Sequence, residues 1–366
     1  MKTMPATRWS LTLSFLFSLA LLATACGGGG SSADGDEDDI PFGGEAFLTD
    51  VVEGYYMPLV RHTADDHVLA YRNASGISIY NLNSGDTTLV PESASGTTFT
   101  RGAMAMDKGN LAWQFGQTKL SIFRRGIGNV VSIAPLPNPL LSGMCIADGF
   151  VLTMGANKNL YLFDIMAKNY TSTLPYTTDT GRSVTGFNCY GHKVAVATSN
   201  NIMLIADWEE QSGIVNIPQA SRQEVAILGT PKQVVINDTY VAFVNESNDI
   251  YVIELNNGNA SYKVASQNPP SQGYAQIADL HLDGAYLVWS DDSYGYWTVF
   301  YADLSSRNPV TQSYRYSQMS SSSIKETSPT VDGLTGLVYW PKFTLGDDQP
   351  PVLFRGEVGA ELRPAQ

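Results

Sequence analysis

The chain repeats one pattern seven times, in which a short apolar segment is followed, about nine residues later, by a second one. The repeat length, measured between one reference residue in each first segment, is 42, 40, 44, 46, 46 and 51 residues. β-Branched and aromatic residues dominate both segments, and a period of this length is typical of the four-stranded blades of a β-propeller. We therefore expect an all-β propeller of seven four-stranded blades over residues 45–366, although six or eight blades also fit. The reference residues are Tyr71, Trp113, Thr153, Ala197, Phe243, Trp289 and Trp340.

Turn-forming residues precede the first segment of each pair, as at Asp148-Gly149, Asp283-Gly284 and Asp332-Gly333. Asp, Asn and Gly favour tight turns, so we expect each of these turns to join the innermost strand of a blade to its second strand. A single blade has two apolar faces, which are buried only if the blades pack against one another and the ring closes. We expect residues 46–52 to join the last blade and close the ring.

The amino-terminal segment has the pattern of a bacterial export signal. Lys2 and Arg8 precede an apolar run over 11–22, which is shorter than the roughly 20 residues that a membrane-spanning helix needs. The next residues, Leu22-Ala23-Thr24-Ala25-Cys26, resemble a bacterial lipobox, which implies cleavage before Cys26 and lipidation of its thiol. We therefore predict a lipoprotein signal peptide at 1–25 and a membrane anchor at Cys26. The alternative is an ordinary signal peptide that is cut after Ala25.

Residues 26–44 are mostly Gly, Ser, Asp and Glu. This composition cannot bury enough apolar surface to fold, so we predict a flexible tether between the lipid and the propeller. Gly27 follows Cys26, and bacterial lipoproteins without Asp at this position are commonly sorted to the outer membrane. We expect an exported, outer-membrane-anchored lipoprotein, which faces either the periplasm or the exterior.

The tether also has the carboxylate spacing of an EF-hand-like calcium loop, at Asp34, Asp36, Asp38 and Glu45. Asp39, however, stands where the loop needs a glycine, and no helical pattern flanks the segment. We therefore predict no metal site here and no cofactor in the chain.

Charge bears on the class of partner. The chain has 22 basic and 35 acidic side chains, and the predicted cleavage would also remove Lys2 and Arg8. Nucleic-acid binding needs clustered Lys and Arg to neutralise phosphates, and Arg124-Arg125 is the only such pair that stands out. We expect a partner that is an envelope protein or a glycan rather than a nucleic acid.

The sixth repeat resembles a known propeller family. Residues 287–304 read LVWSDDSYGYWTVFYADL, which is similar to the TolB-like repeat, where an aliphatic-Trp-x-Asp segment leads through a Gly turn to an aromatic strand ending in Asp-Leu. Weaker copies of this repeat lie in the first and fifth blades, and the resemblance to TolB-like and WD-repeat-like propellers extends over 55–360. The chain has no room for the extra α/β domain of the Tol-system protein, so that protein's partnership does not carry over. The fold alone does not decide the function.

Two cysteines remain if Cys26 is lipidated. Cys145 and Cys189 each lie eight residues before the reference residue of their blade, so we expect them at equivalent positions on the innermost strands of adjacent blades. An exported compartment permits a disulfide between them, but such strands lie near the limit of about 7 Å between Cα atoms. The two remain either a disulfide or a pair of buried thiols.

No common catalytic motif is present: there is no Gly-x-Ser-x-Gly, His-Glu-x-x-His, Cys-x-x-Cys or phosphate loop. The best candidates for ligand binding are in the sixth blade. His281 lies between two carboxylates and could face the central channel, and the loop between the second and third strands carries carboxylates and aromatic rings. His281 could instead be a polar residue in a water-filled channel, while the acids of the loop could end a strand and its rings could pack between blades. The candidates are Asp279, His281, Asp283, Asp291, Asp292, Tyr294, Tyr296 and Trp297.

Three further aromatic residues extend these candidates. Trp289 could stack on a sugar ring together with Trp297, although packing between blades is the alternative. Tyr314 and Tyr316 follow the loop, and we expect both to be exposed.

These observations favour a lipid-anchored propeller that presents one rim of its loops to a protein or glycan and does not catalyse a reaction. The alternative is a propeller enzyme that acts on polysaccharide or peptide, with Asp279, Asp283 and Asp291 as acid and base. A third interpretation is a structural subunit of an envelope assembly, which resembles the outer-membrane assembly lipoprotein propeller but lacks its recurring signatures.

Overall fold

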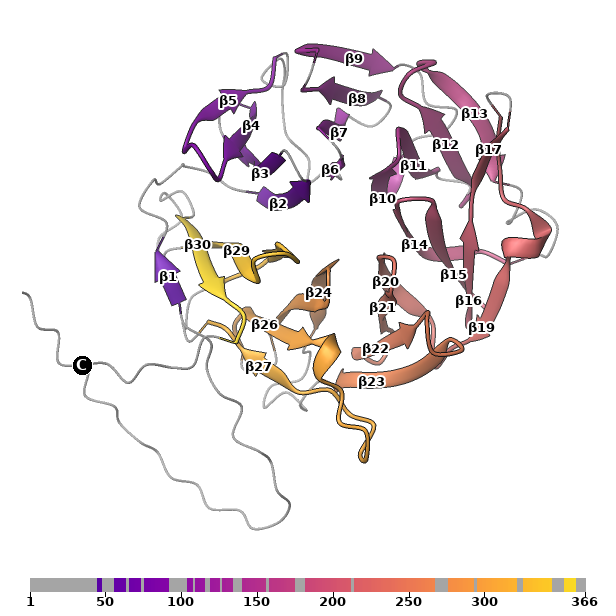
Figure 1. The fold of residues 1–366 in the computed structure, drawn as a ribbon, viewed down its shortest axis with the longest axis vertical. Helices are drawn as coiled ribbons and strands as arrows, with labels where there is room; N and C mark the ends of the chain where they lie inside the picture. Colours follow the sequence, from indigo (N-terminus) through magenta and orange to yellow (C-terminus); the bar gives the residue numbers. More distant parts are fainter. Residues whose placement is uncertain are drawn as a thin grey trace, which may run out of the picture. The chain divides into compact units, whose positions relative to one another are not determined.

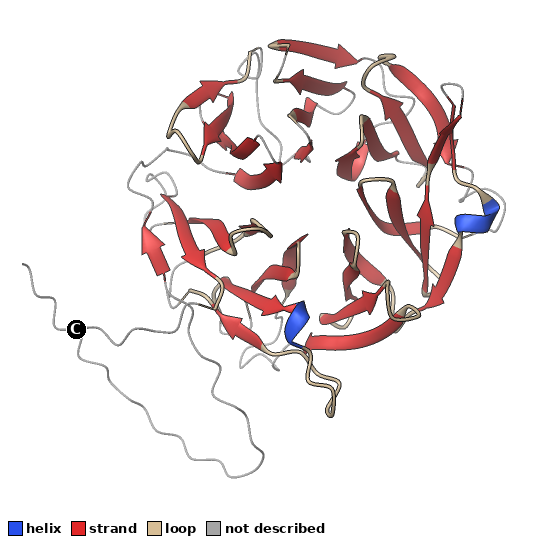
Figure 2. Ribbon diagram, viewed as in Figure 1, coloured by secondary structure: helices blue, strands red, loops and turns tan. Residues whose placement is uncertain are grey.

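The computed structural model describes residues 45–47, 56–63, 66–73, 76–91, 104–107, 109–115, 119–125, 127–133, 140–155, 158–174, 182–211, 214–266, 276–292, 295–320, 325–343 and 352–359. These residues are almost entirely β-strands and turns, with two short 3-10 helices, η2 (Gln219–Ser221) and η3 (Leu304–Ser306), as Figure 2 shows. No helix in this described part is both long and apolar enough to cross a membrane. The prediction of an all-β fold is confirmed.

The strands of the described ranges form seven four-stranded antiparallel sheets, which is consistent with the seven blades expected. Blade one contains β2 (Tyr56–Thr63), β3 (Asp66–Asn73), β4 (Gly76–Asn81) and β5 (Thr87–Leu89). Blade two contains β6 (Met104–Asp107), β7 (Asn110–Phe115), β8 (Lys119–Arg124) and β9 (Asn129–Ile133). Blade three contains β10 (Leu140–Ala147), β11 (Phe150–Gly155), β12 (Leu160–Asp164) and β13 (Asn169–Leu174).

The next blades follow the same order of strands. Blade four contains β14 (Val184–Tyr190), β15 (Lys193–Thr198), β16 (Ile202–Asp207) and β19 (Gln223–Ala226). Blade five contains β20 (Pro231–Ile236), β21 (Tyr240–Asn245), β22 (Asp249–Glu254) and β23 (Ala260–Ser266). Blade six contains β24 (Ile277–Asp283), β25 (Tyr286–Asp291), β26 (Thr298–Asp303) and β27 (Tyr316–Gln318).

Blade seven is built from both ends of the domain. It contains β28 (Thr330–Val331), β29 (Leu337–Lys342) and β30 (Val352–Glu357), and its fourth strand is β1 (Glu45–Phe47), which pairs antiparallel with β30. The sequence predicted that the segment starting at residue 46 closes the last blade, and the pairing of Ala46 with Arg355 agrees with it.

The blades are arranged around a closed ring (Figure 1). Their innermost strands contact one another in the order β2, β6, β10, β14, β20, β24 and β28, and β28 contacts β2 again. Because consecutive strands of a blade run antiparallel, the turns between strands one and two and between strands three and four lie on one rim, which we call the turn rim. The loops between strands two and three and the connections between blades lie on the other rim, the connection rim.

The core lies between the blades. The seven reference residues, one on the second strand of each blade, are at most 1% exposed, and they include the fully buried Trp113, Trp289 and Trp340. Side chains alternate along each innermost strand, so that Leu280 and Leu282 of β24 pack in the cluster shared with blade five. Burial of such side chains stabilises the domain by roughly 1.5–3 kcal/mol each.

Blade four carries an insertion that the repeat did not predict. Between its third and fourth strands, the hairpin of β17 (Glu209–Gln211) and β18 (Ile214–Asn216) contacts β13, the outermost strand of blade three. Trp208, at the base of this hairpin, is 2% exposed and lies edge-on to Phe150, with 6.3 Å between the ring centroids. The hairpin therefore covers a sheet edge that would otherwise be open to pairing with another chain.

Candidate functional site

The three candidates on the innermost strand of blade six face blade seven. Asp279, His281 and Asp283 alternate with Leu280 and Leu282, which face blade five, and same-face positions on a strand are about 7 Å apart. The structure therefore places the three side chains in a row along the seam between β24 and β28.

Asp279 binds the chain just before β28. Its Oδ2 accepts hydrogen bonds from the backbone N of Ser328 at 3.0 Å and from the Ser328 hydroxyl at 3.3 Å, and Ser290 Oγ lies 3.4 Å away. Asp279 has a φ of 55°, and a bulge interrupts the pairing of β24 with β25 beside it. The bulge re-aims the side chain at the neighbouring blade.

His281 and Asp283 continue the row. The Val331 backbone N donates to His281 Nδ1 at 3.2 Å, and His281 Nε2 lies 3.2 Å from Thr330 Oγ1. A neutral imidazole with its proton on Nε2 satisfies both contacts. Asp283 Oδ2 accepts a hydrogen bond from the Gly333 backbone N at 3.0 Å. The three side chains thus accept hydrogen bonds from backbone N–H groups in and beside β28, a strand that does not pair with β24.

The same arrangement recurs at other seams. The residue just before the first turn of a blade reaches the next blade in blades two, five and seven as well as in blade six. Asp107 Oδ2 accepts from Asp148 N at 3.1 Å, and Asn237 Nδ2 donates to Gly284 O at 2.7 Å. The fully buried Asp332 pairs with His67 of blade one. The sequence identified Asp332 as a turn former only, although an Asp directly before a turn glycine, as at Asp283-Gly284 and Asp332-Gly333, was an available signal.

The two carboxylates at the connection rim of blade six lie at the end of β25 and directly after it, and Asp292 holds the blade's own chain. Asp291 is 7% exposed at the end of β25. Asp292 exchanges hydrogen bonds with Gln276: its N donates to Gln276 O at 3.2 Å, and its Oδ1 accepts from Gln276 N. Blade five has the same clasp between Glu246 and Thr230, which shows that the contact is a repeated feature of the blades.

The aromatic candidates divide into three groups. Tyr296 and Trp297 are half-buried beside the connection rim, whereas Tyr294 lies outside the described residues. Trp289 stacks on Phe300, with ring centroids 5.9 Å apart, so its faces are occupied by packing.

The expectation that Tyr314 and Tyr316 are exposed is wrong. Tyr314 is 5% exposed, and Tyr316 packs on Trp289 with ring centroids 5.9 Å apart. Both lie where the chain returns from a loop to form β27, which brings their rings into the core shared by blades five and six.

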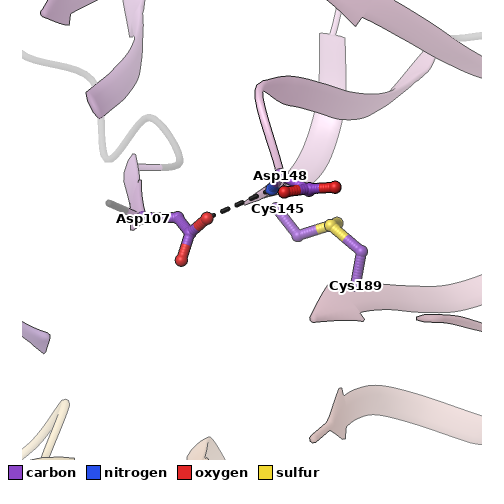
Figure 3. The surroundings of a disulfide bond; sticks show 4 residues. All are labelled: Asp107, Cys145, Asp148 and Cys189. Carbon is purple, nitrogen blue, oxygen red and sulfur yellow. Dashed lines mark hydrogen bonds between the residues drawn. A yellow bond between two sulfur atoms is a disulfide. The ribbon is translucent and has the colours of Figure 1, made fainter. Parts of the chain in front are cut away.

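Cys145 and Cys189 form a disulfide between the innermost strands β10 and β14, with Cα atoms 5.6 Å apart (Figure 3). The predicted equivalence of their positions is wrong by one residue. Cys145 lies two residues before the end of β10, and Cys189 lies one residue before the end of β14. Equivalent positions would point the same way around the ring, so this offset is what lets the two side chains face each other.

The predicted signal peptide, Cys26 and the predicted tether all lie outside the described residues. Within the described ranges, no group of three or more His, Cys, Asp and Glu side chains is placed to hold a metal ion.

A polar cluster that the sequence did not indicate joins blades five and six at the turn rim. Glu254 Oε1 accepts hydrogen bonds from Arg307 Nε at 2.8 Å and from the Tyr314 hydroxyl at 2.5 Å, and Asn257 Nδ2 donates to Oε2 at 2.9 Å. The Arg307 guanidinium also covers the ring of Tyr262, with its Cζ 4.2 Å from the centroid. Arg307 and Tyr314 lie 53 and 60 positions from Glu254 in sequence, so no local pattern connects them with it.

This environment shifts the pKa values of Glu254 and Tyr314. Burial raises the pKa of Glu254, but the hydrogen bonds from Tyr314, Asn257 and Arg307, together with the Arg307 charge, outweigh that effect and hold it below its usual value. Burial and the hydrogen bond to Glu254 both raise the pKa of Tyr314. Glu254 is therefore ionised and Tyr314 protonated at neutral pH.

Arg307 and Tyr314 are the two ends of a loop that projects from the ring between β26 and β27 (Figure 1). Asn308 organises the loop: its Oδ1 accepts from Val310 N at 2.8 Å, and its backbone N donates to Ser313 O at 2.9 Å. Val310 at the tip is 87% exposed.

No protein-family model matches the sequence, and no curated protein does. Solved structures do match. U3-55K has a TM-score of 0.60 at 11% identity, over 86% of this chain and 100% of that one. The WD40 repeats of RRP9 have a TM-score of 0.59 at 11% identity, over 87% and 99%. A chain in the mitotic checkpoint complex has a TM-score of 0.56 at 11% identity, over 93% and 100%. At these identities the likeness shows the fold alone, which is a WD-repeat-like β-propeller.

Proposed function

We propose that this protein is an exported, lipid-anchored β-propeller that binds an envelope protein or glycan and does not act on it as an enzyme. The observation that carries the proposal is that Asp279, His281 and Asp283 hold two blades together. All three bind blade seven, through the backbone of Ser328, Val331 and Gly333. Side chains in this role hold two blades together, which leaves the loops at the rims as the surface for function.

The likeness to solved propellers supports a protein partner only in general terms. One similar chain belongs to a structure of the mitotic checkpoint complex, so a propeller of this shape is found there in an assembly. That assembly is a property of the similar chain. The partner class of the present chain is inferred from its own surface residues.

The anchor rests on the lipobox-like sequence that ends at Cys26. The tether would join the domain at Glu45, which pairs with Gly356 at the end of β30. This end of β30 is at the turn rim, because the next residue but one, Val358, donates from its N to Gly336 O in the first turn of blade seven. The anchor would therefore leave the domain from the turn rim.

The anchor is tested by substitution of Cys26 in the full chain. We expect Cys26→Ala to move the protein from the membrane fraction to the soluble fraction, and mass spectrometry of the unaltered protein to find an acylated Cys26 at the mature terminus. A mature terminus other than an acylated Cys26 would contradict the proposal.

The binding role is tested with the full lipidated chain in detergent, incubated with envelope extract. We expect recovery of one stoichiometric partner, protein or glycan, whose chain length is unchanged after incubation. Shortening of that partner by the unaltered protein, but not by Asp279→Asn, would show an enzyme instead.

A further inference from the structure

We propose that the loop over 304–315 is the recognition element of the protein, and that its partner is a protein with an apolar pocket that receives Val310. This inference rests on the proposed binding function and specifies the partner class and the contact residue. We call this segment the blade-six loop.

The blade-six loop is held in one conformation from both ends. At its base, Arg307 and Tyr314 both bind Glu254 of blade five, and Tyr314 is 5% exposed. At its start, Asp303 Oδ1 accepts from Ser305 N at 2.9 Å and caps η3. A loop whose ends are fixed in this way loses little conformational entropy when it binds, which favours affinity.

The tip carries no charge, and its most exposed side chain is apolar. Val310 is the most exposed of the large hydrophobic side chains in the described ranges, at 87%. Its neighbours from 308 to 313 are Asn, Pro, Thr, Gln and Ser, in a chain that carries 35 acidic side chains. A partner that recognises this tip therefore needs an apolar pocket with polar groups at its edge.

The rings beside the loop favour a protein over a glycan. Sugar rings bind to open aromatic faces, but Arg307 covers the face of Tyr262. Tyr314 is buried and meets Tyr262 edge-on, with 6.4 Å between centroids, and Tyr240 donates its hydroxyl to Leu304 O at 3.2 Å. At the tip of the loop, by contrast, the aliphatic side chain of Val310 is open to solvent.

The experiment uses the full chain in its own membrane with a photoreactive residue in place of Val310. The matched control carries the probe at Leu228, which is 66% exposed in the connection between blades four and five, on the connection rim. We expect one protein to be crosslinked from position 310 and not from position 228. We also expect Val310→Asp to weaken binding of that protein at least tenfold, and Leu228→Asp to leave it unchanged.

Two further measurements separate recognition by the loop from mere proximity. Tyr314→Phe removes the hydrogen bond to Glu254 at the base of the loop and does not change the side chain of Val310. We expect it to weaken binding, because the loop is no longer fixed in one conformation. Binding through an apolar pocket should also change less than twofold between low and high salt. Equal crosslinking from 310 and 228, or binding unaffected by Val310→Asp, overturns the inference.

Failure of this inference can be told from failure of the proposed function. A partner that is captured by the unaltered chain, but is insensitive to Val310→Asp, contradicts the inference and supports the binding role. Capture of a glycan through this loop likewise overturns it. Absence of any partner with the unaltered chain contradicts both.

Discussion

Gly284 and Gly333 pack against each other where the first turns of blades six and seven meet. A Cβ on Gly333 would lie 2.4 Å from the backbone N of Gly284, and its other near neighbours are backbone atoms of Asp283. Backbone at this distance cannot move aside as a flexible side chain can. The hydrogen bond from Gly333 N to Asp283 depends on this close approach.

We expect Gly333→Ala to lower the free energy of unfolding by about 3 kcal/mol, because the methyl group forces the two turns apart. The measurement is equilibrium denaturation of the domain. Gly258→Ala is the control: Gly258 has a φ of 60° and open space around it, so it should cost only about 1 kcal/mol of backbone strain. Equal effects of the two substitutions would show that the turns are not in contact.

Glu254 makes stability depend on pH. Its pKa is lower in the folded protein than its usual value, so the carboxylate contributes stability above the unfolded pKa, near 4.3, and this contribution is lost as pH falls through the folded pKa. We expect Glu254→Gln to cost about 1–3 kcal/mol at pH 7 and to flatten the fall in stability below about pH 4.

The measurement is thermal unfolding between pH 3 and 7. The control is Glu224→Gln, which removes an ion pair with Arg182 in which the carboxylate is 49% exposed, and which should change stability by less than about 1 kcal/mol. If stability falls in the same way at low pH in Glu254→Gln and in the unaltered protein, the lowered pKa of Glu254 is contradicted.

Among the elements, the innermost strands β10 and β14 are joined covalently. The disulfide closes a loop with a sequence separation of 44 residues, and its loss should destabilise the domain by about 4 kcal/mol in the chain-entropy model. We expect the Cys145→Ser, Cys189→Ser double substitution to show this in thermal unfolding, and the unaltered domain to show no free thiol at these positions. Two titratable thiols in the folded, unreduced protein would contradict the bond.

The strand pairs and their turns could be predicted because they depend on local patterns. Apolar segments nine residues apart with Asp-Gly turns specify a meander, and β3 with β4 or β25 with β26 lie where the pattern placed them. The contacts between blades could not be predicted in the same way. They depend on how strands more than 40 residues apart are offset, and an offset of one residue decides which neighbour a side chain meets.

The candidate site shows the same limit. Asp279, His281 and Asp283 were grouped correctly on one strand, but the sequence does not state that Ser328, Val331 and Gly333 lie opposite them. The blade-six loop was missed because its anchors, Glu254 and Arg307, belong to different blades. Its exposed tip also carries no charged, aromatic or metal-ligating residue that would mark a binding site in the sequence.

At the scale of the whole molecule, the ring depends on a three-residue strand. β1 supplies the outer strand of blade seven, and its pairing with β30 joins the first and last described strands. We expect deletion of 45–47 to destabilise the domain by on the order of 2 kcal/mol, through lost strand pairing. Deletion of 27–44 should leave stability unchanged, because that segment is predicted to be tether.

Thermal unfolding and limited proteolysis of the two deletions measure this difference. Cleavage is expected to begin in blade seven when β1 is absent. If both deletions unfold at the same temperature as the unaltered protein, β1 does not contribute to closure.

The pairing of Glu45 with Gly356 also sets the order of assembly. β1 is synthesised before the other strands of the domain and cannot pair until β30 has been made. Closing a loop that spans almost the whole domain carries a large entropic cost. Until the ring closes, blades one and seven each expose an apolar face that no neighbouring blade covers. If the amino terminus is already fixed in lipid, the closure of the ring takes place beside the bilayer.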